Sequence, residues 1–383
     1  MNTTSSKNPK FHIYEYILYW LATAFILLLA IPVLIGKFVV YLVRSTGAPL
    51  KSAGNFIGFI LVLLIISMTY LTYEVLIPYN IGSEHHTVTV EENEPFSKTA
   101  ANLHQAGIIR SEHLFRMAAV LGRIDKYTIP GRYDFRGEVS LYDILQKFKR
   151  RDVATVMVTI PEGSNIYKIG SILSHDLGID SAAFVTRAND TAFTKARFNI
   201  NGLEGYLFPE TYQFWYGMKI DNIFDAMYEQ FQRRVAPLAD SLPPDIPSLH
   251  DLITLASIIE GEATVDDEMP VVSSVYHNRL KDNMLLQADP TVLYALGGAA
   301  KALSRDDLKI QSPYNTYNVA GLPPGPINCP GMKAILAALR PAQTEYLYFV
   351  ADGTGHHIFS RTLDEHNNAR IKIKRMRRYS RPS

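Results

Sequence analysis

The 383-residue sequence contains very little cysteine and no excess of charge of either sign. Cys329 is the single cysteine, so no intramolecular disulfide can form, and this scarcity fits an exported protein as well as a cytosolic one. Lys and Arg together number 38 and Asp and Glu 37, so no global charge points to nucleic acid as a partner.

Motifs of several common catalytic chemistries are also absent. There is no HExxH, and the later histidines show no recognised zinc spacing beyond one adjacent pair, so we predict no metal site. The sequence has no GxSxG, no SxxK with partner motifs and no Gly-rich phosphate loop, and we predict no cofactor. Carboxylate chemistry on an uncharged polar polymer is the class that remains.

Two long apolar runs dominate the N-terminal part. After a polar tail at 1–12, cytoplasmic or external, residues 13–35 predict a transmembrane or interfacial helix, and 56–77 predict a transmembrane helix. The segment 36–55 between them is basic and the segment after the second run is acidic, which makes 36–55 a cytoplasmic loop. We therefore expect a protein of the cytoplasmic membrane, with everything after about residue 78 outside.

An internal repeat begins the globular part. TVTVEENEPFSKTAANLHQAGII (87–109) aligns without gaps to MVTIPEGSNIYKIGSILSHDLGI (157–179). Each copy alternates for a few residues, turns, and then takes up a helical period, which predicts a strand–turn–helix unit used twice. We assign 87–180 to one small β/α module that serves either for binding or as scaffold.

The rest of the chain indicates a mainly helical domain at 181–370, followed by a basic tail at 371–383. Asp352-Gly353 between two short alternating runs predicts a small β-hairpin near its end. The predicted fold class is α+β, with N-terminal membrane helices, the repeat module and this mixed domain.

A helix at 251–262 carries the most interesting carboxylate, Glu260. Its apolar residues recur at helical spacing and Ser248 is the expected N-cap, while Gly261 is expected to loosen the helix end. Glu260 follows Ile259 at the edge of the apolar face, where partial desolvation would raise its pKa and suit it to general acid catalysis. On its own, an exposed glutamate at a helix end is the more frequent situation.

Several other polar residues lie in apolar or rigid contexts. They are Glu204, Gln287, Asp289, Tyr314 and Asn315. Their side chains suit hydrogen bonding to sugar hydroxyl and acetamido groups, and the proline-rich loop near Tyr314 would hold them in place. Each also has a structural alternative: Glu204 could bind backbone amides, Asp289 could start a helix, and Asn315 could cap a turn.

Six blocks of the sequence resemble, in order, the signature of the endolytic murein transglycosylase family (MltG, or YceG-like). The blocks are LEGYLFPETY (203–212), ASIIEGEA (256–263), VYHNRL (275–280), LQADPTVLYAL (286–296), SPYNTYNVAGLPPGPI (312–327) and YLYFVADGTGHHIFSRTLDEHN (346–367). The resemblance implies a LysM-like repeat module and a catalytic residue at Glu260. It also implies an activity that cleaves nascent peptidoglycan strands internally, and peptidoglycan synthases as partners.

The resemblance implies lytic cleavage of the MurNAc–GlcNAc bond by one carboxylate that acts twice, with formation of 1,6-anhydroMurNAc and an end to glycan elongation. Glu260 would protonate the leaving oxygen and then accept the proton of the MurNAc 6-hydroxyl. Two alternatives stay open at this point. One is a non-catalytic, membrane-anchored peptidoglycan-binding scaffold; the other is a hydrolase whose second carboxylate is Glu204 or Asp289. Family members usually carry a basic residue where this chain has Gly261, which leaves burial against Ala256 and Ile259 to raise the pKa of Glu260.

Overall fold

The computed structural model describes residues 37, 41, 50–124, 128–263, 265–297 and 303–379. The predicted tail at 1–12 and the apolar run at 13–35 lie outside the described residues, as does the end of the basic tail. The first long helix is α2 (Leu50–Leu76), which takes in the end of the predicted 36–55 loop as well as the second apolar run. Within the described part of the chain, no helix is both long enough and apolar enough to cross a membrane.

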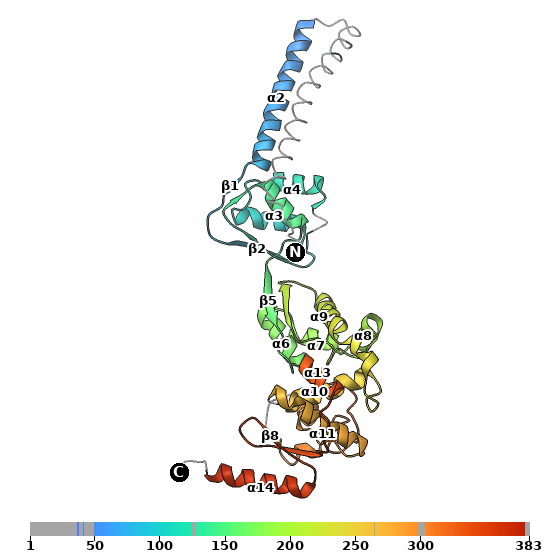
Figure 1. Cartoon of the computed structure of the whole chain (residues 1–383). Coiled ribbons are helices and arrows are strands. Elements are labelled where there is room, and N and C mark those ends of the chain that lie inside the picture. Colours follow the sequence, from blue (N-terminus) through green and yellow to red (C-terminus); the bar gives the residue numbers. More distant parts are fainter. Residues whose placement is uncertain are drawn as a thin grey trace, which may run out of the picture.

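The molecule is elongated, and its units follow one another from α2 to the C-terminal helix α14 (Figure 1). The first unit after α2 contains β1 (Tyr79–Asn80), β2 (His86–Val90), α3 (Phe96–Gln105), α4 (Glu112–Leu121), β3 (Gly131–Phe135), β4 (Glu138–Val139) and α5 (Leu141–Lys149). Strands β2 and β3 pair antiparallel, with Val88 opposite Tyr133. Phe115, Tyr133 and Phe148 fill its core.

The second unit contains β5 (Thr155–Thr159), α6 (Ile166–Leu177), α7 (Ser181–Ala188), α8 (Thr191–Phe198), β6 (Thr211–Trp215) and α9 (Ile220–Arg234). Strand β5 pairs antiparallel with β6, with Val158 opposite Tyr212. Both predicted strand–turn–helix copies are therefore present, as β2–α3 and β5–α6. They belong to different cores, however, so the cores divide the chain near residue 154, whereas the predicted module runs to 180.

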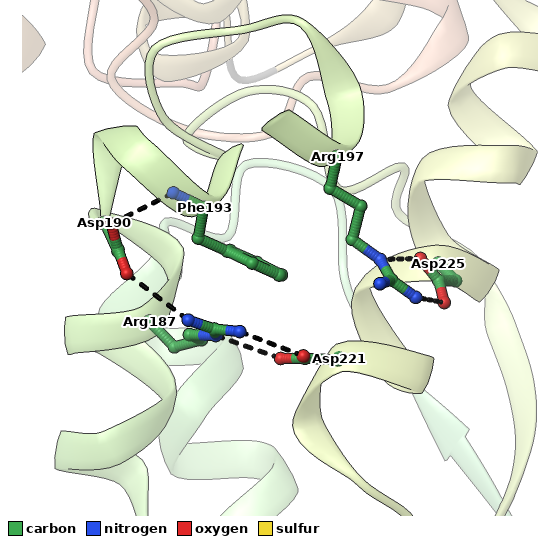
Figure 2. A network of polar contacts seen from close by, with 6 residues as sticks. All are labelled: Arg187, Asp190, Phe193, Arg197, Asp221 and Asp225. Atoms are coloured by element: carbon green, nitrogen blue, oxygen red, sulfur yellow. Dashed lines mark hydrogen bonds and ion pairs between the residues drawn. The ribbon is translucent and has the colours of Figure 1, made fainter. Parts of the chain in front are cut away.

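Ion pairs fix the helices of the second unit around Phe193 (Figure 2). Arg187 of α7 donates two hydrogen bonds of 3.0 Å to the Asp221 carboxylate at the start of α9, and its guanidinium lies 3.6 Å from the Phe193 ring centroid. Arg197 of α8 binds Asp225, one turn further along α9. These bidentate pairs set the position of α7 and α8 on α9.

The third unit is built around α10 (Leu249–Glu262). It contains the 3₁₀ helices η2 (Ala236–Ser241), η3 (Asp266–Glu268) and η4 (Asp307–Lys309), the helices α11 (Met269–Lys281), α12 (Asp289–Ala295) and α13 (Met332–Leu339), the strands β7 (Tyr348–Ala351) and β8 (His357–Ser360), and α14 (Leu363–Tyr379). The predicted hairpin is confirmed as the antiparallel pair β7–β8. Helix α10 packs against α11, α12 and α13, which places it in the middle of this core.

Candidate active site at the end of helix α10

Helix α10 is more deeply buried than its sequence pattern predicts. All eight residues from Leu252 to Ile259 are buried, so the middle of the helix is enclosed on every side and has no solvent face. The predicted N-cap is confirmed, since the Ser248 hydroxyl accepts a hydrogen bond from the Asp251 amide. Glu260 therefore emerges from the end of a buried helix and not from the edge of an apolar face.

Glu260 is half-buried and anchored through one oxygen. Its Oε2 accepts a hydrogen bond of 3.0 Å from the backbone N–H of Gly331, the residue before α13. Burial raises the pKa of the Glu260 carboxyl; the Gly331 hydrogen bond opposes this shift, and the negative charges of Glu162 and Asp266 add to it. The position near the carboxyl end of α10 acts in the same direction, because the helix dipole disfavours an anion there. The site therefore favours the protonated form of Glu260, which is the form that a general acid needs.

Two chain segments from different units form the wall beside Glu260. Cys329 N donates to Ser164 O at 2.9 Å and Gly163 N donates to Cys329 O at 3.0 Å, so the loop after β5 runs against the segment before α13. A Cβ atom placed on Gly163 would lie 3.4 Å from Glu260 Cγ. Glu162 precedes this glycine, and a Cβ on Gly331 would overlap its carboxylate. Neither Glu162 nor Gly331 is among the site residues predicted from sequence, although the repeat alignment pairs Glu162 with Glu92.

Gly261 does not loosen the helix as predicted; α10 continues through Glu262. A Cβ on Gly261 would lie 2.8 Å from Cβ and 3.0 Å from Cγ of Pro290, at the start of α12. Close packing between these helices therefore explains the glycine. It also means that α12 occupies the space that a basic side chain would enter at this position.

Glu262 points away from Glu260 into a second polar cluster. Tyr276 OH donates to Glu262 Oε1 at 3.2 Å, and burial raises the pKa of Glu262 to about 7. The nearby Asp289 carboxylate, whose Oδ1 accepts a 2.6 Å hydrogen bond from Tyr317 OH, also raises this pKa. Asp289 opens α12 as expected and is exposed.

Glu204 has structural contacts and is almost completely buried. Its two oxygens accept hydrogen bonds from the Ile166 amide at the start of α6, at 3.2 and 3.4 Å. Burial raises its pKa to about 8, while this amide and the Tyr294 hydroxyl lower it. The Tyr314 ring lies against Tyr294, with centroids 5.0 Å apart, so the structure brings Glu204 and Tyr314 together around one tyrosine.

Asn315 and Gln287 differ in their access to solvent. Asn315 is completely buried, and its amide donates to Leu308 O and Ile310 O at 2.9 Å each, so it organises the loop from within. Gln287 is exposed, in a left-handed conformation with φ of 50°. Of the five positions predicted to bind substrate, Gln287, Asp289 and the half-buried Tyr314 have surface available for a glycan. Such contacts stay predictions.

Known proteins align with most of the chain. An endolytic murein transglycosylase of Bacillus subtilis is 34% identical over 302 residues, which span 74% of this chain and 84% of that protein. One from Streptococcus pneumoniae is 26% identical over 368 residues, spanning 84% of this chain and 64% of the relative. A crystal structure of a yceG-like protein from Listeria monocytogenes matches with a TM-score of 0.51 and 32% identity, over 75% of this chain and 99% of that one.

The profile of the YceG-like family matches residues 88–372, a range that contains Glu260, Gly331 and the Glu162 loop. The predicted resemblance is confirmed by this match together with the Bacillus relative. The chain belongs to the YceG-like family.

Proposed function

We propose that this protein is an endolytic lytic transglycosylase that cleaves MurNAc–GlcNAc bonds of nascent peptidoglycan strands and so terminates their elongation. The setting of Glu260 carries the proposal, because a half-buried carboxylate with a raised pKa is the group that such a reaction requires. The relatives from Bacillus and Streptococcus, both named endolytic murein transglycosylases, support it.

The reaction needs no water. Protonated Glu260 donates its proton to the glycosidic oxygen as the bond from that oxygen to C1 of MurNAc breaks. The ionised carboxylate then accepts the proton of the MurNAc 6-hydroxyl while O6 bonds to C1, which forms the 1,6-anhydro ring. Gly331 N–H holds Oε2 throughout, so Oε1 is the oxygen available for both transfers. Glu260 ends in its starting protonation state.

We further propose that the apolar N-terminal part of the chain, to which α2 belongs, holds the protein at the cytoplasmic membrane, with the catalytic unit outside. Support comes from the apolar side chains that α2 exposes, among them Val62, Leu64 and Ile66, and from the charge difference between its flanking segments. The membrane, the glycan strand and peptidoglycan synthases are then its partners. Reporter fusions at residue 5 and within 36–55 test this topology, and an external 36–55 loop would contradict it.

The test of the activity is Glu260→Gln in the full-length protein, assayed on purified glycan strands with mass spectrometry of the new ends. We expect the release of anhydro ends to fall by about 10²-fold or more, the range for loss of a general acid. Glu92→Gln is the control for loss of a glutamate charge, because Glu92 pairs with Lys219 in the first repeat copy and is not among the groups that shift the pKa of Glu260.

Undiminished release of anhydro ends by Glu260→Gln would overturn the assignment. Binding without cleavage by the unmodified protein would favour the scaffold alternative. Ends that carry solvent oxygen and lack the anhydro mass would favour the hydrolase.

A further inference from the structure

The loop between β5 and α6 reaches the active site from a different core. It is held there by the backbone bridge between Ser164 and Cys329, and Gly163 within it lies against the Glu260 side chain. Gly163 has φ of 69°, which asparagine also tolerates, but a side chain there would meet Glu260. The loop therefore packs directly against the Glu260 side chain.

Glu162 and Glu260 meet at one residue, Gly331. The Gly331 amide donates to Glu260 Oε2, and the Glu162 carboxylate lies in the space that a Gly331 side chain would fill. Glu162 is exposed whereas Glu260 is half-buried, so the two carboxylates differ in solvation although they lie close together. Neither Glu204 nor Asp289, the predicted second carboxylates, is among the charges that act on Glu260.

We propose that Glu162 is a positioning residue of the active site, which keeps Glu260 protonated before cleavage and makes it a better base afterwards. The inference rests on the proposed function and adds a second carboxylate to it. The same repulsion serves both steps, since a neighbouring negative charge favours the protonated form of Glu260 and so strengthens its proton affinity once it is ionised. Glu162 need not touch the substrate.

The other charges around Glu260 belong to η3 and α13. Asp266 also raises the pKa of Glu260, but it is engaged in an ion pair with Lys333. The charges of Asp267 and Glu162, like that of Asp266, raise the pKa of Lys333, so this exposed cation faces three carboxylates. Since Lys333 is bound to Asp266, the Glu162 charge is less compensated than that of Asp266. Removal of the Glu162 charge therefore changes the electrostatics at Glu260 without breaking the Asp266–Lys333 ion pair.

The first repeat copy supplies an internal comparison. Glu92 aligns with Glu162, and Asn93, with φ of 61°, aligns with Gly163. There the glutamate forms a 2.7 Å ion pair with Lys219, beside a hollow of about 280 Å³ whose lining does not include Glu260. The loop conformation is thus shared, and the placement of its carboxylate beside a catalytic acid is specific to the second copy.

The experiment is the pH dependence of kcat/KM for the full-length protein and its Glu162→Gln variant, with anhydro-end release as the readout. The alkaline limb reports the deprotonation of Glu260 in the free enzyme. Loss of the Glu162 charge lowers the pKa of Glu260, so we expect this limb to move to lower pH by about half a unit, the size expected for one partly solvated neighbouring charge. Above that limb, activity falls about 3-fold relative to the unmodified protein.

Three further variants make the result specific. Glu92→Gln should leave the alkaline limb at its original pH. Glu162→Asp keeps the negative charge, so its limb should lie close to that pH as well. Gly331→Ala, which displaces the Glu162 carboxylate without removing it, should move the limb in the same direction as Glu162→Gln. A lower rate with an unmoved limb in both Glu162→Gln and Gly331→Ala would overturn the inference and leave the proposed function intact. Full activity of Glu260→Gln would instead overturn the proposed function.

Discussion

Ser257 and Ser164 form a matched pair that tests how the wall beside Glu260 is held. Both side chains are completely buried. Ser257 Oγ donates to Thr254 O at 2.8 Å and accepts from the Ile327 amide at 3.1 Å, which ties α10 to the segment before α13. Ser164 Oγ, on the facing segment, has no hydrogen-bond partner among the residues that the structure describes.

Replacement of Ser257 by alanine leaves the Ile327 N–H buried without an acceptor. A buried donor that loses its partner costs about 1–3 kcal/mol, so the free energy of unfolding should fall by that amount. Ser164→Ala removes a hydroxyl that is desolvated and unpaired, and should be neutral or stabilise the protein by about 1 kcal/mol. Each substitution removes one buried hydroxyl, but only the loss of the Ser257 hydroxyl should destabilise the protein.

Urea denaturation of both variants measures the difference in stability. Because the chain has three separate cores, its unfolding need not be two-state, and hydrogen exchange of the Ile327 amide provides the local readout. We expect this amide to exchange faster in Ser257→Ala and at an unchanged rate in Ser164→Ala. Equal stability of the two variants, or a larger loss for Ser164→Ala, would refute the reasoning.

Two other substitutions test the packing and the buried charge around α10. Gly261→Ala should lower stability by up to about 2 kcal/mol, because overpacking against Pro290 outweighs the gain of about 1 kcal/mol in helix propensity; an increase in the urea midpoint would contradict this. Burial raises the pKa of Glu204 from 4.5 to about 8, so its contribution to stability is complete below pH 4.5 and is lost as the pH rises to 8. Glu204→Gln stays neutral and should flatten the urea midpoint between pH 4.5 and 8; an unchanged slope would show that Glu204 is not the titrating group.

Local signals made the helices of this chain predictable. Ser140, the N-cap of α5, forms a complete capping box with Asp143. The predicted cap Ser248 accepts a hydrogen bond from the Asp251 amide, and Pro270 lies in the first turn of α11. Each of these signals acts within three or four residues, which is the range over which sequence patterns are reliable.

The features that depend on distant residues were not predictable. Strand β6 lies within the domain predicted to be mainly helical, and it exists because β5 supplies a partner more than fifty residues earlier. Asn315 was selected as a polar loop residue, but only the fold shows that its amide is used up inside the loop. Glu162 reaches Glu260 through the bridge between Ser164 and Cys329, which no local pattern reveals.

The two strand–turn–helix copies share their packing but differ in what surrounds their loops. The apolar positions that both copies share, Val88 with Val158, Leu103 with Leu173 and Ile109 with Ile179, are all buried. The loops between strand and helix instead meet different surroundings. A small unit can therefore keep one packing pattern while its loop serves different surroundings. In this chain the loop of the second copy lies beside Glu260, whereas the loop of the first copy pairs with Lys219.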